Sequence, residues 1–300
     1  MCSKKPSFYQ VPEDLMRRFE EKDLIIFVGS GASKLCGILS WKGLANNLID
    51  KIFRDGKISY DVSESLKNES SLKALSVCKS IINQDDYLKK YVEECFIAKG
   101  ETGRNIHKAI NKFACACITT NYDTLLEQNG MLQREKNFDS FIKDPTDKVF
   151  YLHGRADDNI NQIILTLKSY CIYYAEKGAG REILKRLFSE KSVLFIGLGL
   201  EEFEIVEHVH VSKSDSRHYA LMPMKDHEVN LIEEYKEYYD AMNIELIPYN
   251  ISIKGYIELE NVLLDWSEQV EAKRNSLSEE QKRSKNILND IKFIDEAIKE

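Results

Sequence analysis

Short, nearly continuous apolar runs are the feature that most constrains the fold of this chain. Such runs indicate strands that are covered on both faces, as in a parallel sheet, because a half-exposed strand alternates apolar and polar residues. Helical patterns such as EILKRLFSE and HEVNLIEEYKEYYDAM lie between most of the runs, and this alternation predicts a doubly wound α/β fold. The seven runs are LIIFVG (24–29), ACITTN (116–121), VFYLHG (149–154), QIILT (162–166), SVLFIG (192–197), HYALMP (218–223) and IELIPY (244–249).

Two segments interrupt the alternation. Residues from about 40 to 112 contain helical patterns, such as LKALSVCKSIIN and QDDYLKKYVEECFIAK, and no clear strand. We therefore expect a Rossmann-like, mainly parallel sheet domain over 1–255 with a helical insertion lobe at about 40–112. The highly charged residues 256–300 predict a C-terminal helical arm with a break near Ser276–Ser278. This arm is either a solvated terminal helix or a surface that docks a partner or a second copy of the chain.

Charge and apolar content restrict the cellular setting. The formal net charge is −7, whereas nonspecific nucleic-acid binders are usually basic, so we predict no direct nucleic-acid binding. No apolar run approaches the ~20 residues that span a bilayer, and the first residues lack the apolar core of a signal peptide. We expect a cytoplasmic protein. Its seven cysteines form no CxxC pair, and Cys115 and Cys117 are expected to be ordinary buried thiols rather than metal ligands.

The first apolar run ends in a glycine-rich turn, GSGAS (29–33), before a helical pattern resumes. Small residues at such a junction let the backbone approach a phosphate, and free N–H groups at a helix start attract negative charge. The same junction also occurs where backbone packing alone requires small residues. The turn is not a Walker loop, since no Gly-Lys-Ser/Thr follows, and Lys34 replaces the third glycine of the GxGxxG pattern of dehydrogenases.

Three later runs also end in residues that carry chemistry. Their continuations are Thr120–Asp123 (TNYD), His153–Arg155 (HGR) and Gly197–Glu202 (GLGLEE). Strand ends on one side of an α/β sheet share one crevice, so a carboxamide, an imidazole and two glycine turns would meet there. Each motif alone has a simpler interpretation: Asp123 as a helix cap, His153 as a packed turn residue and the glycines as a tight turn.

The motifs GSGAS, TTNYD, LHG and FIGLGLEEFEI, in this order, resemble the sirtuin superfamily, and most closely the sirtuin-like domains of bacterial antiviral defence proteins. ITTNYDTLLE is the most specific match, and GILSWKGL resembles the first turn of these domains better than that of protein deacylases. The resemblance also takes in NIHKAI, LTLKSYCIYY, HYALMP and IELIPY, and it covers about residues 20–250.

The sequence departs from the sirtuin pattern at two points. Deacylase sirtuins carry a four-cysteine zinc module after the HG motif, whereas residues 155–191 contain only Cys171, so we expect no zinc. Relatives often have Asp where Glu202 stands, which makes the reach of this carboxylate one methylene longer here.

The resemblance implies NAD as the substrate and cleavage of its nicotinamide–ribose bond. Asn121 and His153 would be catalytic: Asn121 would bind the ribose or orient water, and His153, with an ordinary pKa near 6.5, would act as general base. Amides of Gly31, Ala32 and Ser33 would hold the pyrophosphate. The full set of expected NAD-binding residues is Gly29, Ser30, Gly31, Ala32, Ser33, Trp41, Thr120, Asp123, Gly154, Gly197, Gly199, Leu200 and Glu202.

Three functions follow from these considerations. The favoured one is an NAD hydrolase that releases nicotinamide and ADP-ribose in anti-phage defence. The alternatives are a zinc-free NAD-dependent protein deacylase and a non-enzymatic NAD or ADP-ribose sensor. The resemblance also implies a homo-oligomer and control by a regulatory ATPase, a sensor domain or a phage trigger protein. The sequence does not distinguish NAD from NADP.

Overall fold

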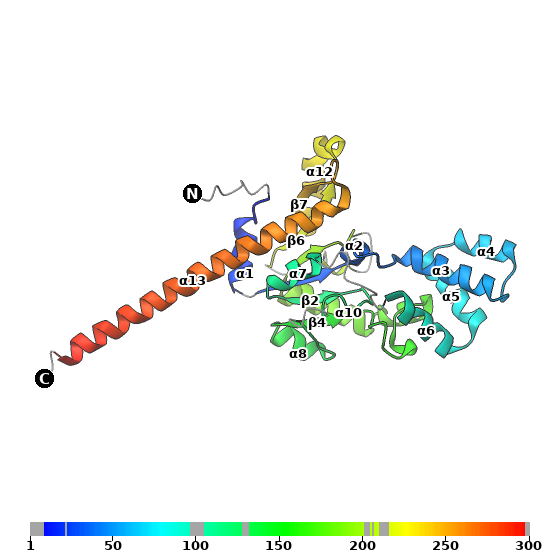
Figure 1. Cartoon of the computed structure of the whole chain (residues 1–300), viewed down its shortest axis with the longest axis horizontal. Coiled ribbons are helices and arrows are strands. Elements are labelled where there is room, and N and C mark those ends of the chain that lie inside the picture. Colours follow the sequence, from blue (N-terminus) through cyan, green and yellow to red (C-terminus); the bar gives the residue numbers. More distant parts are fainter. Residues whose placement is uncertain are drawn as a thin grey trace.

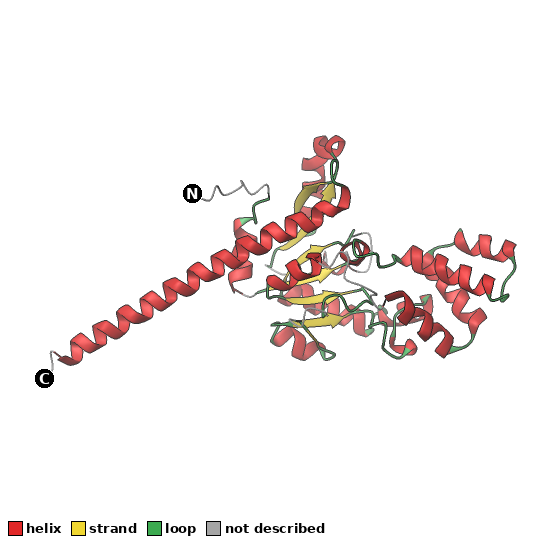
Figure 2. Cartoon of the chain, viewed as in Figure 1, coloured by secondary structure: helices red, strands yellow, loops and turns green. Residues whose placement is uncertain are grey.

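A central parallel sheet organises the chain (Figure 2). The structure, a computed structural model, describes residues 9–21, 23–96, 105–127, 132–200, 205, 207–209 and 216–297, without the side chains of 280–297. Within these residues all strand pairs are parallel, in the order β3-β4-β2-β1-β5-β6-β7, which confirms the predicted Rossmann-like α/β class. The strands are β1 (Leu24–Val28), β2 (Ala116–Thr119), β3 (Gln133–Arg134), β4 (Lys148–Tyr151), β5 (Ser192–Ile196), β6 (His218–Met224) and β7 (Ile244–Asn250).

Helices cover both faces of the sheet, which is why its inner strands are apolar on both sides. One face packs against α1 (Glu13–Glu21), α7 (Asn105–Lys112) and the first part of α13 (Glu258–Ala297). The other face packs against α8 (Phe138–Lys143), α10 (Ala179–Glu190) and α12 (Ile232–Asp240). All five residues of β1 and all five of β5 are buried, as continuous apolar runs predict. None of the helices within the described residues is both long and apolar enough to cross a lipid bilayer.

A helical lobe stands beside the sheet, at the opposite end of the molecule from the tip of α13 (Figure 1). It contains α3 (Trp41–Arg54), α4 (Tyr60–Lys67), α5 (Ser71–Ile82) and α6 (Asp85–Phe96), which enclose an apolar cluster of their own. Serine side chains cap three of these helices; the hydroxyl of Ser40, for example, accepts the amide of Gly43 and starts α3. The later helix α7 packs instead against α13 and the sheet.

Two local predictions were wrong, and one short strand was missed. The run QIILT is not a strand: a short 3-10 helix (Ile160–Gln162) leads into an irregular segment, whose Ile163 and Leu165 are buried in the cluster of the lobe. Edge strand β3 has only two residues and no apolar run to reveal it. No break interrupts α13, whose backbone is helical from Glu258 to Ala297, because Ser276 and Ser278 are tolerated in a solvated helix.

The strand order reverses beside β1, and this reversal creates the crevice. The chain passes from β1 to β2 and β4 on one side, and later returns to pair β5 with the other edge of β1. In open α/β sheets the loops that follow the strands on either side of such a reversal separate and leave room for a ligand. The motifs after β1, β2, β4 and β5 therefore lie at one edge of the sheet.

Candidate functional site

The glycine-rich turns after β1 and β5 pack backbone against backbone. A Cβ atom added to Gly29 would lie 2.5 Å from the carbonyl oxygen of Gly197, and one added to Gly31 would lie 2.7 Å from it. Gly197 itself has a φ of +65°, and a Cβ there would meet the amide nitrogen of Ala32 at 2.5 Å. Packing alone therefore requires glycine at all three positions, because no side chain fits between the turns.

This packing also uses amides that we expected to face a pyrophosphate. The amide of Gly31 donates to the carbonyl of Gly197 at 2.8 Å, and the amide of Ala32 donates to the carbonyl of Gly29 at 3.3 Å. The helix that follows, α2 (Ser30–Lys34), has only five residues. Two of the three expected phosphate-binding amides thus have protein acceptors in this arrangement.

One pocket lies where the sheet meets the helical lobe. Apolar residues of the lobe and of the turn before it form one wall, and polar residues from the ends of β1 and β2 form the other. Six residues predicted from the sequence meet here, namely Ser30, Ser33, Trp41, Thr120, Asn121 and Asp123. The pocket also contains Ile38, Leu39, Leu44, Phe96 and Tyr122, which the sequence analysis did not single out. Trp41 packs against Tyr122 with ring centroids 5.9 Å apart, so it serves the lobe core as well as the pocket.

Asn121 is held in one orientation by the turn after β1. Its Nδ2 donates to the carbonyl oxygen of Gly29 at 3.1 Å and to the hydroxyl of Ser33 at 3.0 Å. Because a carbonyl oxygen only accepts, the amide cannot be flipped without losing the bond to Gly29. Both N–H groups are occupied, and no donor among the described residues reaches Oδ1. Asn121 therefore offers the pocket a hydrogen-bond acceptor.

Asp123 is a buried carboxylate with one oxygen left over. Its Oδ1 accepts the amide of Leu125 at 3.0 Å, whereas Oδ2 has no partner among the described residues. Burial raises the pKa of Asp123, while hydrogen bonds from the Ser33 hydroxyl and the Leu125 amide act in the opposite sense. The bond to Leu125 closes a turn, and no helix follows within the described residues, so the simpler interpretation as a helix cap was wrong; the second oxygen is enclosed by the protein.

His153 is buried among tyrosines and does not line this pocket. Its Nε2 lies 2.7 Å from the hydroxyl of Tyr174, and its Nδ1 has no partner among the described residues. Burial lowers the pKa of His153 to about 3, so the ring is neutral at physiological pH. The expected pKa near 6.5 was wrong, because that value belongs to a solvated imidazole and this one is 2% exposed.

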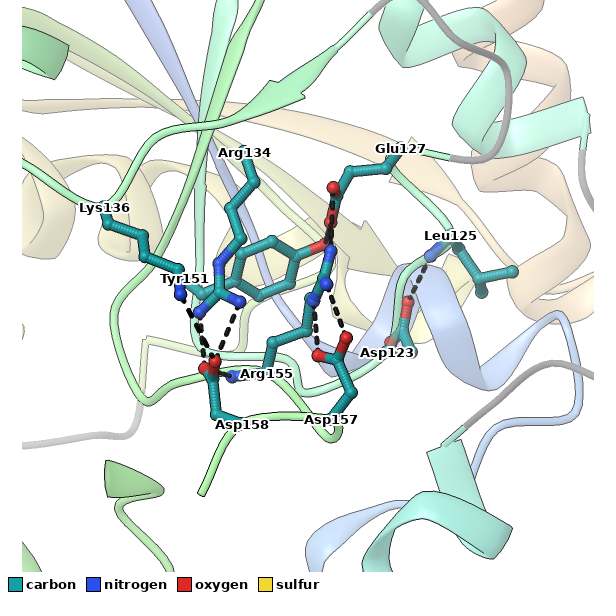
Figure 3. Close-up of polar contacts among 9 residues, drawn as sticks. All are labelled: Asp123, Leu125, Glu127, Arg134, Lys136, Tyr151, Arg155, Asp157 and Asp158. Atoms are coloured by element: carbon teal, nitrogen blue, oxygen red, sulfur yellow. Dashed lines mark hydrogen bonds and ion pairs between the residues drawn. The ribbon is translucent and has the colours of Figure 1, made fainter. Parts of the chain in front are cut away.

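Ion pairs join the segment after β2 to the turn after β4 (Figure 3). Arg155 donates to both carboxylate oxygens of Glu127 at 2.8 and 2.9 Å, and the hydroxyl of Tyr151 donates to the same carboxylate at 2.7 Å. Arg155 also pairs with Asp157, and its amide donates to Asp158 at 2.9 Å. The network therefore fixes the turn that follows His153 relative to the segment that follows Asp123. Its members are Glu127, Arg134, Lys136, Tyr151, Arg155, Asp157 and Asp158.

A polar row that the sequence analysis missed lies behind Ser33. His107 on α7 places Nε2 3.5 Å from the Ser33 hydroxyl and Nδ1 3.5 Å from the sulfur of Cys36. Burial lowers the pKa of His107 to about 4, so this imidazole is also neutral. The motif NIHKAI is part of the resemblance, but the sequence assigns no role to its histidine, because nothing in the sequence places it next to the first turn.

The remaining expected residues lie elsewhere. Gly199 and Leu200 line a separate groove beside Met222, Met224 and Tyr239. Gly154, with a φ of +84°, lies in a surface depression near Arg134 and Asp158. Glu202 falls outside the described residues. Among the described residues, no group of three or more His, Cys, Asp or Glu side chains is placed to hold a metal ion.

The chain is an open parallel-sheet α/β protein, and its pocket lies where the strand order reverses, the place at which proteins of this class bind their ligands. Within this class, residues 116–247 match the family model described as the SIR2-like domain, which confirms the resemblance seen in the motifs. The matched segment contains Asn121, Asp123 and His153 but not the first glycine-rich turn.

One relative is the NAD(+) hydrolase ThsA of Cytobacillus dafuensis. It is 24% identical to this chain over 199 residues, an alignment that covers 63% of this chain. The same alignment spans 38% of the length of that relative.

Proposed function

We propose that this chain is an NAD hydrolase that cleaves the bond between nicotinamide and ribose. The observation that carries the proposal is the acceptor that Asn121 offers to the pocket, with the buried carboxylate of Asp123 beside it, both within the segment that matches the SIR2-like domain. A ribose hydroxyl or a water molecule is a suitable donor for such acceptors. The relative named NAD(+) hydrolase supports NAD as the substrate.

The chemistry needs little from the protein beyond positioning and electrostatics. Neutral nicotinamide leaves with the electron pair of the C–N bond, the oxygen of water bonds to the ribose carbon, and water releases a proton. The ribose carries oxocarbenium character as the bond breaks, and the carboxylate of Asp123 would stabilise this positive charge in a water-poor pocket. The acceptor of Asn121 would orient the water or the ribose. Positioning of this kind lowers the activation barrier by several kcal/mol, and by about 7–11 kcal/mol in the most favourable cases.

His153 is retained in the proposal as the second catalytic candidate. The neutral imidazole accepts a hydrogen bond or a proton at Nδ1 only as the tautomer that donates from Nε2 to the Tyr174 hydroxyl, and burial makes it a weak base. Its action therefore requires that substrate binding brings a hydroxyl or a water molecule to Nδ1. Hydrolysis of this kind suits a weak base, because water attacks an already electron-poor carbon.

The wider role is proposed from the resemblance to defence-associated sirtuin-like domains. NAD depletion during phage infection would require that the enzyme stays inactive until it is triggered. We propose that a homo-oligomer and a partner, such as an ATPase, a sensor domain or a phage protein, supply this control. Size-exclusion chromatography with light scattering, with and without NAD, tests the oligomer directly.

The activity is tested by mixing the purified chain with NAD and separating nicotinamide and ADP-ribose by chromatography. We expect nicotinamide release without any peptide, and its loss in Asn121→Ala. Asn68→Ala is the matched control, because Asn68 is an exposed residue that caps α4 in the lobe and should leave the rate unchanged.

The other functions give different results in the same experiment. A deacylase would release nicotinamide only with an acetyl-lysine peptide, and a sensor would bind NAD in calorimetry without turnover. A wild-type chain that neither binds nor cleaves NAD, with or without peptide, would contradict the NAD hydrolase and both alternatives.

A further inference from the structure

Helix α13 is longer than the surface that it covers. Its first part packs against α7, β7 and α1, and Val270 is the last buried residue among its described side chains, which run to Glu279. The backbone stays helical to Ala297, and Figure 1 shows that the outer part of the helix extends away from the sheet. Residues 277–297, the outer segment, span roughly 30 Å at about 1.5 Å per residue. Because helices in proteins gain most of their stability from packing, a segment of this length needs a partner.

The outer segment carries the pattern of a coiled-coil helix. Ile287, Ile291 and Ile294 are four and three residues apart, so they share one face of the helix, and Leu277 lies two heptads before Ile291. In a heptad written abcdefg these residues occupy positions a and d, which form the seam between two paired helices. Helix propensity does not account for them, because isoleucine is a poorer helix former than lysine, arginine or glutamate.

Charged residues beside this seam identify what fits it. Arg283 and Asp290 are seven residues apart, and both occupy position g. Residues at positions e and g flank the seam and pair across it, which sets the partner and its orientation. In two antiparallel copies with Ile287 of one opposite Ile291 of the other, the g positions of the two helices meet. Arg283 of each copy then lies across from Asp290 of the other, so the outer segment is complementary to itself about a twofold axis.

Other arrangements of two copies bring like charges together. In a parallel pair, position g lies across from position e of the next heptad, which puts Asp290 across from Asp295. An antiparallel pair shifted by one heptad brings Asp290 across from Asp290 of the second copy, or Arg283 across from Arg283. Like charges at such positions oppose association, so the seam and the charges together select one register.

We propose that the outer segment of α13 is a dimerisation element that pairs antiparallel with the same segment of a second copy. Ile287 and Ile291 form the centre of the contact, and the two pairs of Arg283 with Asp290 fix its register. The contact gives the homo-oligomer proposed above a defined place in the chain. It does not depend on NAD cleavage, because it involves none of the residues of the pocket.

Sedimentation equilibrium of the full chain measures the pairing as a concentration-dependent change from monomer to dimer. Ile291→Asp puts a charge at the centre of the seam in both copies and should raise the Kd by about 100-fold or more. Asn289→Asp is the matched control, because it adds the same charge at position f, on the opposite face of the helix, and should change the Kd by less than about twofold. Circular dichroism checks that each variant is folded.

Exchanging the two charges tests the register. Arg283→Asp and Asp290→Arg each replace two attractions by two repulsions, and each should raise the Kd by ~5- to 30-fold. The double variant restores opposite charges and should return the Kd to within about threefold of wild type. In a parallel pair, Asp290→Arg would instead lower the Kd, because it removes the repulsion from Asp295.

Four results would overturn the proposal. A wild-type chain that stays monomeric leaves no pairing to explain, and an oligomer that Ile291→Asp leaves unchanged has its contact elsewhere. A double charge variant as weak as the single variants, or tighter association of Asp290→Arg, excludes the antiparallel register. Nicotinamide release, measured on the same samples, reports on the proposed function separately, since the substituted residues lie outside the pocket.

Discussion

Replacing Gly31 by alanine tests how the two glycine-rich turns are held together. The added Cβ would lie 2.7 Å from the oxygen of Gly197, whereas ordinary contact begins at 3.4 Å, so the turns must separate by about 0.7 Å. Both belong to adjacent strands of the core, and forcing an extra methyl group into such a site costs about 1–3 kcal/mol. The 2.8 Å bond from the Gly31 amide to Gly197 is weakened by the same movement, at about 0.5–1.5 kcal/mol.

We therefore expect Gly31→Ala to lower the free energy of unfolding by about 2–4 kcal/mol. For a chain of this size that corresponds to a fall in Tm of roughly 5–15 °C. Thermal unfolding followed by circular dichroism measures it. The matched control is Gly43→Ala on α3, where the nearest atom to the added Cβ is at 3.4 Å and helix propensity favours alanine by up to about 1 kcal/mol. If Gly31→Ala unfolded within about 1 °C of wild type, the account of the two turns as rigid backbone contacts would be refuted.

Three further predictions concern His153, the ion-pair network and the buried histidines. Tyr174→Phe leaves Nε2 of His153 buried without a partner and should lower the free energy of unfolding, measured with denaturant, by about 1–3 kcal/mol. Tyr173→Phe is the control, because this ring contacts His153 only edge-on, and it should lower the free energy less. Equal losses would contradict the hydrogen bond between His153 and Tyr174. Arg155→Met should lower the free energy of unfolding by about 1–2 kcal/mol, because the Arg155 side chain is 20% exposed and pairs with Glu127. Arg17→Met, at a surface pair with Asp14, should lower it by under about 0.5 kcal/mol. The opposite order would refute a stabilising role for the network. Burial lowers the pKa of His107 and His218 to about 4 and that of His153 to about 3, so the unfolded chain binds more protons below about pH 6.5 and stability should fall there as pH drops. Between pH 7.5 and 5.5 each histidine should lower the free energy of unfolding by about 1.4 kcal/mol. His218→Phe should reduce the difference between unfolding curves measured at these two pH values by that amount, and an unchanged difference would exclude His218 as a contributor.

The apolar pattern of the sequence was sufficient for the sheet but not for every run in it. β1 and β5 were predicted from their apolar runs, and all five residues of each strand are buried in the structure. QIILT is a similar short apolar run, yet Ile163 and Leu165 are buried in the cluster of the lobe instead of between neighbouring strands. Composition predicts that a side chain is buried, but the partner against which it is buried is a property of the assembled chain.

The sequence by itself determined the class of fold, the edge of the sheet that carries the pocket, and six residues that line it. These follow from local rules, since strand periodicity and the turn residues after each strand are written within a few positions. The tertiary structure alone decided the hydrogen-bond partners. The bonds that orient Asn121 and reach His107 join residues 88 and 74 positions apart, and the pKa of His153 depends on tyrosines brought over it by the fold. Distances and burial of this kind set donors, acceptors and charge, and no local pattern in the chain encodes them.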